Sequence, residues 1–368
     1  MQLGRKKVSR LDFSTPIITL VLFMIGMLTI YSATYAPETA SWLSPVDRRQ
    51  LAWFFIGLAG MGISFAIDYH MYQKIAYVAY GTAIILLVLV LIIGKTSMGA
   101  QRWLTIAGFT FQPSELTKLA VVLGLSRFFA ERRTSPPYNL KELLIPFCMV
   151  GLPFILVLKQ PDLGTALLIV LISLVIIFYA GITRRAIMTL VFAGIAAATC
   201  GWQFLHDYQR QRILIFLNPD IDPQGAGYHI AQSKIAVGSG GLWGKGFLKG
   251  TQNLLHFLPE QHTDFIFSVF AEQWGFLGAA LLISLYLLFL LRGLVISQEA
   301  KDPYGSYLAI GITATFFWQF CINIGMVLGL MPVVGIPLPL MSYGGTSLLT
   351  SMILVGMLLN IHFRKQYF

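Results

Sequence analysis

Residues 75–93 read IAYVAYGTAIILLVLVLII, a run without a charged side chain. A helix rises about 1.5 Å per residue, so this run is long enough to approach the far side of a hydrocarbon core roughly 30 Å thick. Residues 277–291, LGAALLISLYLLFLL, have the same character. Lipid offers no hydrogen-bonding partner to the backbone, so such segments must be helical. The stretch therefore predicts a membrane-spanning helix.

The composition of the whole chain agrees with this prediction. Of its 368 residues, 56% are hydrophobic and 11% are charged, and the mean hydropathy is +0.72. Apolar surface on this scale cannot be buried inside one water-soluble globule. We predict an all-α polytopic membrane protein.

Apolar runs separated by Gly, Pro and charged residues predict about ten transmembrane helices. They lie near residues 16–36, 51–67, 75–93, 115–130, 143–158, 163–181, 186–205, 265–291, 305–330 and 342–361. No internal repeat or polar linker divides the chain, so we predict one domain over residues 1–368. One connection, residues 206–264 between the seventh and eighth helices, is far longer than an ordinary loop, and long loops of this kind are usually functional.

The distribution of basic residues predicts the topology. Loops on the side of the N-terminus carry fifteen Lys and Arg residues, and the short loops on the opposite side carry five. By the positive-inside rule both termini are cytoplasmic and the segment 206–264 is extracytoplasmic. The net charge of +10 then reflects topology and attraction to anionic membrane lipid, so we predict no nucleic-acid partner.

Ionisable residues at membrane depth are costly, which makes each one a functional candidate. Glu115 and Lys118 in FQPSELTKLA are three residues apart on one helix face, so they either pair with each other or line a substrate cavity. Asp162 in KQPDLGT stands at a helix start, where it is expected to cap the helix. Glu272, inside the eighth helix, is expected to pair with another buried polar group such as Asn323, with a proton relay as the alternative.

Asp264 has a different position. In PEQHTDFIF (259–267) it stands where the long outer segment enters the eighth helix, within reach of water and of a membrane-anchored substrate. The positive end of the helix dipole favours an ionised carboxylate, which can accept a proton or hold a divalent cation. The residues alone leave open whether Asp264 is catalytic or caps the helix. Glu260 is one turn farther out, and we expect it to be peripheral.

Two glycine-containing segments are unusual. GSGGLWGKGFLKG (238–250) lacks the Lys-Ser/Thr ending of a phosphate-binding loop, and we expect its backbone to lie close to a membrane surface or a ligand. MPVVGIPLPLMSYGG (331–345) can lie at membrane depth only where protein covers it. We expect residues 330–345 to form a partly re-entrant connection, with a plain surface loop as the alternative. The histidines of the outer segment, His206, His229, His256 and His262, lack the spacing of a metal site.

Several long motifs identify a family. HDYQRQRI (206–213), DPQGAGYHIAQSKIAVGSGGLWGKG (222–246), FLPEQHTDFIF (257–267) and NIGMVLGLMPVVGIPLPLMSYGGTSLL (323–349) together resemble the SEDS family of shape, elongation, division and sporulation proteins. AQRWL and FQPSE extend the resemblance into the first half of the chain. HDYQRQR and MPVVGIPLPLMSYGG resemble the cell-elongation branch of the family more than the division branch.

The resemblance implies a ten-helix glycosyltransferase of the bacterial inner membrane that polymerises lipid II, with its active site on the extracytoplasmic side. The family's essential aspartate falls on Asp264, which would act as general base or as metal ligand. Glu115, Lys118 and Asp162 match family positions in the membrane cavity. Cations are needed for the departing diphosphate. The candidates by residue type and side of the membrane are Arg102, Lys118, Arg210, Arg212, Lys234, Lys245 and Lys249.

The resemblance also implies cofactors and partners. A divalent cation, Mg²⁺ or Mn²⁺, is expected, and no organic cofactor. The expected partners are lipid II, membrane lipid, a class B penicillin-binding protein with transpeptidase activity, and other membrane proteins of the elongation complex. Two alternatives remain: a flippase that transports the lipid-linked precursor, and a noncatalytic scaffold of the elongation complex.

Overall fold

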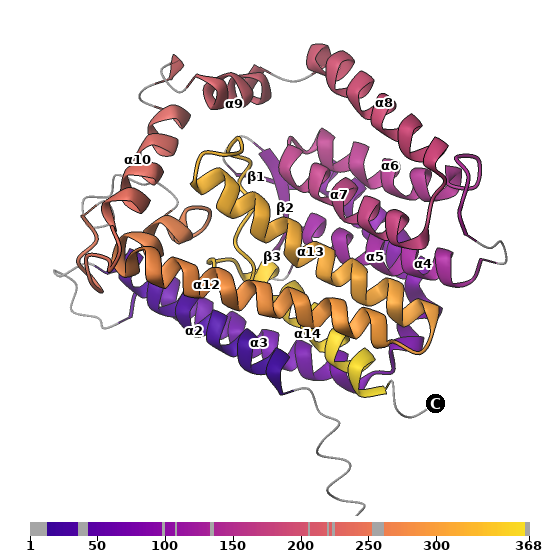
Figure 1. The fold of residues 1–368 in the computed structure, drawn as a ribbon, viewed down its shortest axis with the longest axis horizontal. Helices are drawn as coiled ribbons and strands as arrows, with labels where there is room; N and C mark the ends of the chain where they lie inside the picture. The colour runs from indigo at the N-terminus through magenta and orange to yellow at the C-terminus, as the bar shows by residue number, and fades with distance from the viewer. Residues whose placement is uncertain are drawn as a thin grey trace, which may run out of the picture.

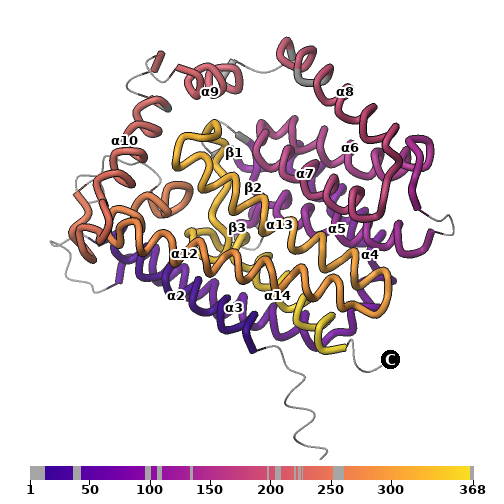
Figure 2. The backbone as a smooth tube through the Cα atoms, in the orientation of Figure 1, coloured from indigo at the N-terminus to yellow at the C-terminus, as the bar shows by residue number. Residues whose placement is uncertain are grey.

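The protein is a bundle of long helices, with shorter helices arched over one end (Figures 1 and 2). The computed structural model describes residues 13–35, 43–97, 100–106, 109–132, 136–204, 207–218, 221–222, 225–251 and 261–364. The bundle helices are α2 (Ser14–Thr34), α3 (Pro45–Ala66), α4 (Tyr69–Ile93), α5 (Pro113–Ala130), α6 (Leu144–Lys159), α7 (Leu163–Ala180), α8 (Arg184–Gly201), α12 (Ile266–Glu299), α13 (Pro303–Val327) and α14 (Gly345–Arg364).

Each of the ten predicted helical ranges coincides with one of these helices. Seven of the described helices are long and apolar enough to cross a membrane: α2, α4, α7, α8, α12, α13 and α14. The helices α3 and α5 each carry three charged residues, and α6 has only 16 residues. The helical membrane fold is therefore confirmed, while a total of ten spans stays a prediction.

Some helices extend beyond their predicted ranges because their end turns contain polar residues. The helix α3 begins at Pro45, six residues before the predicted start. Ser44 caps it by accepting from the backbone N–H of Asp47, whose carboxylate accepts in return from the N–H of Ser44. Such a capping box satisfies donors that have no partner within the helix. A search for apolar runs misses it because the first turn is charged.

A small antiparallel sheet, which the sequence analysis did not predict, joins α4 to α5. Its strands are β1 (Lys95–Ser97), β2 (Ala100–Ile106) and β3 (Phe109–Phe111), in the order β1-β2-β3. In the second pairing Leu104 lies opposite Phe111. The sheet fixes the entry to α5, which carries two of the predicted site residues.

The start of α12 lies at the opposite end of the bundle from the start of α2 and the end of α14. Phe13, just before α2, and Phe363, near the end of α14, line the same apolar pocket. At the other end of α2, the carbonyl of Ala33 accepts from the Gln261 side chain at 2.8 Å, directly before α12. A helix of 21 residues is about 31 Å long. The two ends are therefore separated by about the thickness of a hydrocarbon core.

Between α8 and α12 the described residues include η1 (Trp202–Phe204), α9 (Asp207–Leu217) and α10 (Ala226–Ser239), which arch from α8 to the start of α12 (Figure 1). The helix α8 stands at the edge of the bundle, and its large side chains Met188, Val191, Phe192 and Ile195 are exposed. An apolar helix exposed in this way is suited to contact with lipid.

The helix α12 is interrupted at Gly275, whose backbone has φ 65° and ψ −164°. In an uninterrupted helix the N–H groups of Phe276 and Leu277 would bond the carbonyls of Glu272 and Gln273. A loop of residues 240–250, here called the outer strap, satisfies all four groups instead. The strap carbonyls at 241 and 242 accept from the N–H groups of Phe276 and Leu277 at 2.8 and 3.2 Å. The strap N–H groups at 245 and 246 donate to the carbonyls of Glu272 and Gln273, each at 3.0 Å.

The glycines of the outer strap allow this backbone-to-backbone contact. A Cβ at Gly244, which has φ +82°, would lie 2.1 Å from the carbonyl oxygen of Gln273. A Cβ at Gly240 would lie 2.2 Å from the carbonyl oxygen of Ala271. The glycines therefore serve a contact with α12 of the same chain, which the sequence analysis did not expect; a close approach to a membrane surface or a ligand stays a prediction.

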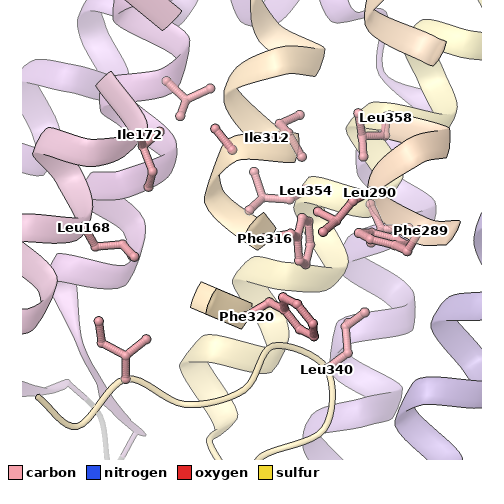
Figure 3. Packing of buried hydrophobic residues seen from close by; sticks show 14 of the residues in the cluster. Leu168, Ile172, Phe289, Leu290, Ile312, Phe316, Phe320, Leu340, Leu354 and Leu358 are labelled. Atoms are coloured by element: carbon pink, nitrogen blue, oxygen red, sulfur yellow. The ribbon is translucent and has the colours of Figure 1, made fainter. Parts of the chain in front are cut away.

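Residues 328–344, between α13 and α14, are irregular in backbone and largely packed into the bundle. Ile336, Leu338, Leu340 and Met341 are each at most 3% exposed. Figure 3 shows Leu340 in one apolar cluster with residues of α7, α12, α13 and α14. The burial agrees with the expected re-entrant connection and not with a plain surface loop; its depth in a membrane stays a prediction.

Gly26 of α2 tests the packing of this connection. A Cβ at Gly26 would lie 2.5 Å from the carbonyl oxygen of Met341, whereas a Cβ at Gly81 of α4 has no neighbour within 4 Å. Both changes to Ala bring the same gain in helix propensity, about 1 kcal/mol. We expect Gly26→Ala to be less stable than Gly81→Ala by about 1–3 kcal/mol through overpacking. Thermal unfolding of both purified variants measures this, and equal stabilities would contradict the close packing.

Candidate active site

Asp264 lies in the turn 261–265, directly before α12, and its side chain is partly exposed. The N-cap residue of α12 is Phe265, so Asp264 stands one residue before the cap. The structure therefore does not use Asp264 as the N-cap, which was one of the two alternatives. Its carboxylate is at the end of the bundle opposite to the start of α2 and the end of α14.

Bonds from three residues hold this turn in place. Asn323 of α13, which is fully buried, donates its side-chain amide to the carbonyl of Asp264 at 2.9 Å and to that of Ile336 at 2.8 Å. The Ser342 hydroxyl donates to the carbonyl of Thr263 at 2.6 Å. The backbone N–H of Tyr343 donates to the carbonyl of residue 262 at 2.9 Å. The turn before α12 and the connection 328–344 thus form one hydrogen-bonded unit.

Four residues of that connection, Val333–Ile336, link the candidate residues. We call them the VVGI segment. A Cβ at Gly335, which has φ +72°, would lie 3.2 Å from Oδ2 of Asp264, so the glycine leaves the carboxylate room. The carbonyl of Val333 accepts from the Arg212 guanidinium at 3.1 Å. The carbonyl oxygen of Val334 would lie 2.8 Å from a Cβ at Gly164, in the first turn of α7.

Asp162 caps α7, as predicted. Its carboxylate accepts from the backbone N–H of Thr165 at 3.1 Å and from the hydroxyl of the same residue at 3.0 Å. Gln112 donates to it at 3.3 Å, and Nε of Arg102 lies 3.9 Å from Oδ2. The Arg102 guanidinium also donates to the carbonyls of Gln160 and Pro161. A cation from the sheet is thereby fixed beside the start of α7.

Glu115 and Lys118 form the predicted ion pair. Lys118 Nζ lies 2.7 Å from Glu115 Oε1, and the two side chains are 2% and 7% exposed. Both stand in the first two turns of α5, on the same end of the bundle as Asp264. Because both charges are buried, each depends on the other for compensation.

The predicted pairing of Glu272 with Asn323 is wrong. Glu272 is fully buried in α12, and its Oε1 lies 2.7 Å from Lys245 Nζ and 3.1 Å from the Thr251 hydroxyl. The outer strap supplies Lys245, and Thr251 follows it directly, because the backbone of the strap is held against the α12 kink. Lys245 is therefore an internal partner of α12, and its predicted phosphate contact is not supported by this geometry.

The other predicted cations have separate surroundings. Arg210 donates to the carbonyls of Trp202 and Gln203 at 3.0 and 2.7 Å. Lys234 of α10 is exposed, and its Cε would lie 2.0 Å from a Cβ at Gly329, so the side chain crosses the start of the connection 328–344. Lys249 of the outer strap is exposed.

The described residues allow only a limited metal site. They contain no group of three His, Cys, Asp or Glu side chains suited to hold a metal ion. Burial lowers the pKa of His229, against an opposing effect of Asp222. Mg²⁺ is often bound through one or two carboxylates, with substrate phosphates and waters as the other ligands. Asp264 fits that mode better than a cage made only of protein ligands. Glu260, His206 and His256 lie outside the described residues.

Known proteins share this fold and sequence. A family model of the FtsW/RodA/SpoVE type, described as cell cycle protein, matches residues 13–367. The chain belongs to the FtsW/RodA/SpoVE family. The predicted SEDS resemblance is thereby confirmed, and with it the classification as a multi-pass membrane protein.

Individual members of the FtsW/RodA/SpoVE family are similar over nearly their full length. Peptidoglycan glycosyltransferase MrdB of Escherichia coli (strain K12) is 44% identical over 349 residues, covering 95% of this chain and 94% of that protein. Peptidoglycan glycosyltransferase RodA of Treponema pallidum (strain Nichols) is 34% identical and covers 97% and 99% of the two chains.

Solved structures agree with the fold. A chain from the work titled "Structural coordination of polymerization and crosslinking by a peptidoglycan synthase complex" has a TM-score of 0.82 at 29% identity, covering 97% of this chain and 98% of that one. The rod shape determining protein RodA of Thermus thermophilus has a TM-score of 0.72 at 26% identity, with the same coverage.

Sequence reasoning missed the residues that position the site. Asn323 was expected to bind Glu272, and Gln112 was not singled out, although both stand inside the motifs that identify the family. Only the fold shows that Asn323 contacts two carbonyls 72 residues apart in the chain. The available signal was a buried polar residue beside a Pro- and Gly-rich segment, since irregular backbone in a membrane protein needs donors from neighbouring helices.

The ion pair in α5 makes a prediction about stability. Lys118→Met leaves Glu115 buried without its cation, which should cost about 3–5 kcal/mol. The double variant Glu115→Gln with Lys118→Met removes both charges and should recover part of that loss. The partly exposed pair Arg127–Glu131 is the control, where Glu131→Gln should cost at most about 1 kcal/mol. Thermal unfolding of the purified variants tests this; a double variant as unstable as the single one would contradict it.

Proposed function

We propose that this chain is a peptidoglycan glycosyltransferase that polymerises lipid II, the undecaprenyl-pyrophosphate-linked disaccharide pentapeptide, during cell elongation. Relatives named for this activity match it over nearly the whole chain. The structural observation that carries the proposal is the partly exposed carboxylate of Asp264, held at one end of the bundle by the buried amide of Asn323.

The proposed location is the bacterial inner membrane, with the active site on its extracytoplasmic side. The excess of basic residues in loops on the side of the termini supports a cytoplasmic location for both of them. Asp264 stands at the other end of the bundle, about one helix length away. Its carboxylate is then at the outer boundary between lipid and water, where a lipid-linked sugar can reach it.

In the proposed reaction Asp264 acts as general base. The 4-hydroxyl of the acceptor sugar attacks the anomeric carbon of the donor, and Asp264 takes the hydroxyl proton. The bond from the anomeric carbon to the lipid diphosphate breaks, and the diphosphate leaves with the electron pair. A diphosphate departs without needing a proton, so a single carboxylate suffices for a transfer with inversion. This differs from the pair of carboxylates in a glycosidase.

The departing diphosphate needs positive charge. Arg212 and Arg102 are the best supported cations. Arg212 donates to the VVGI segment, and Arg102 donates to a carbonyl directly before α7, whose first turn packs against that segment. Arg is suited to bidentate phosphate contacts. The exposed amine of Lys234 adds a third. Lys118 is paired with Glu115, and we assign the pair, and not Lys118 alone, to the lining of the substrate cavity.

A divalent cation, Mg²⁺ or Mn²⁺, fits the donor set if Asp264 is a ligand and the substrate supplies phosphate oxygens. When bound, the ion would neutralise the charge of the leaving group. Asp264 then serves as base or as ligand, and the choice between the two is part of the test below. No organic cofactor is proposed.

We also propose that this glycosyltransferase works with a transpeptidase of the class B penicillin-binding type. The structural relative described as a peptidoglycan synthase complex, in which polymerisation and crosslinking are coordinated, supports such a partner. Other membrane proteins of the elongation complex are the further proposed partners.

A polymerisation assay with an Asp264 variant tests the proposed role of this residue directly. Asp264→Asn keeps the size of the side chain but removes the base, so polymerisation of purified lipid II should fall about 10²–10⁴-fold. Glycan product from wild type and variant is compared with and without EDTA, in the presence of the partner transpeptidase. Full turnover by the Asn variant would exclude proton abstraction by Asp264. Loss of wild-type activity with EDTA, restored by Mg²⁺ or Mn²⁺, would favour the ligand role.

The same reconstituted system separates the alternatives. Movement of lipid II across the bilayer without polymer would identify a flippase. Neither activity, with retained binding to the transpeptidase, would identify a scaffold.

Asn323 offers a second test with a matched control. Asn360 of α14 is also fully buried and donates to the carbonyls of Phe65 and Ile67, but at the opposite end of the bundle. Asn323→Leu and Asn360→Leu should both lower stability. Only Asn323→Leu removes a bond to the Asp264 turn, and a misplacement of about 1 Å costs on the order of 10²-fold in rate. Polymerisation per folded molecule measures this, and equal losses in the two variants would refute a positioning role.

A further inference from the structure

The outer strap carries the most exposed aromatic side chain of the described residues. Trp243 is 81% exposed and its neighbour Leu242 is 65% exposed. Both stand among the strap's glycines, and neither side chain takes part in the four backbone bonds to the α12 kink. Large apolar side chains exposed together in this way indicate a contact with something outside the chain.

The backbone bonds fix the level of these two side chains along α12. The carbonyls of Gly241 and Leu242 accept from the N–H groups of Phe276 and Leu277. The strap therefore meets α12 where its second part, residues 276–299, begins. At this level Phe276 is 63% exposed and Leu277 is 48% exposed, and one turn farther Leu281 is 63% exposed.

This exposed face continues along a helix that is apolar enough to cross the membrane. Leu288 and Leu291, two to three turns farther on, are 52% and 56% exposed. A spanning helix presents such side chains to lipid. Leu242 and Trp243 lie at the level where this exposed apolar face begins, since the carbonyl of Leu242 bonds the N–H of Leu277, which argues for the same occupant.

The rest of the strap is compatible with the membrane boundary. Its backbone groups at 241, 242, 245 and 246 have partners on α12, so they need no water. Lys245 is neutralised by Glu272, while Lys249 is exposed and suited to a phosphate headgroup. Tryptophan is enriched at this boundary because its ring is apolar and its N–H is polar.

We propose that Leu242 and Trp243 insert into the boundary between headgroups and acyl chains, and that phospholipid is their partner. The strap is thereby anchored to the membrane and holds the α12 kink, and with it the turn of Asp264, at a fixed depth. The assignment to the outer leaflet rests on the proposed function and its topology. The insertion itself requires only that α12 spans the membrane.

Tryptophan fluorescence in bilayers tests the insertion. The chain has seven Trp residues, so the signal of Trp243 is the difference between wild type and Trp243→Phe, both as full chains in phosphatidylcholine–phosphatidylglycerol vesicles. We expect this difference emission to lie at short wavelength, to lose intensity with lipids brominated near the top of the acyl chain, and to resist aqueous iodide. Emission at the wavelength of hydrated Trp that is quenched by iodide and not by brominated lipid would overturn the proposal.

Two further measurements keep the result specific. Amide exchange of Phe276 and Leu277 should speed up in bilayers for Trp243→Glu but not for Trp243→Phe; equal exchange would refute the anchoring role. If Trp243 is insensitive to brominated lipid and shifts to shorter wavelength only when the partner transpeptidase is added, the surface belongs to a protein partner and the lipid proposal fails. Neither readout depends on polymerisation. A chain that inserts Trp243 into lipid but makes no glycan would therefore refute the proposed activity and not the insertion.

Discussion

The candidate active site depends on one buried amide that binds two carbonyls from separate segments. Asn323 joins the turn before α12 to the VVGI segment, and both are irregular backbone at the end of a membrane bundle. Free carbonyls there have no access to a helical partner, and burying them unpaired is costly. The amide removes that cost and at the same time determines where Asp264 stands. Gly335 then leaves the carboxylate open, since a side chain in its place would contact it.

At several places in the protein, backbone groups without a partner in their own helix form hydrogen bonds with a neighbouring element. Asn360 binds two carbonyls at the other end of the bundle, where α3 gives way to α4. The outer strap replaces the two helical bonds that Gly275 interrupts in α12. In each case a helix ends or bends where the chain must turn, and a polar group from elsewhere in the fold compensates. The bonds made by Asn323 and by the outer strap connect the strap, α12 and the VVGI segment into one unit around Asp264. Arg212 donates to the VVGI segment, and Arg102 donates to the carbonyl of Gln160, just before α7.

The sequence predicts the helices well, because apolar length and breaks in it are local properties. It also predicts the Glu115–Lys118 pair and the capping by Asp162, which depend on residues three apart. It fails for Glu272, whose partners come from the loop held at the α12 kink, and for Asn323, whose amide bonds carbonyls of two irregular segments. The kink itself is missed because a single Gly in an apolar run carries no signal of φ > 0. The strands between α4 and α5 are missed for a related reason: they are short, and their pairing depends on the two helix ends they join.

The central claim is that the Asp264 carboxylate is open to the extracytoplasmic side. Asp264→Cys, in a chain whose Cys148, Cys200 and Cys321 are changed to Ser, reports this through labelling with a membrane-impermeant thiol reagent in sealed vesicles of known orientation. The account predicts rapid labelling from the extracytoplasmic face and none from the cytoplasmic face. Labelling only from the cytoplasmic face, or only after denaturation, would contradict it.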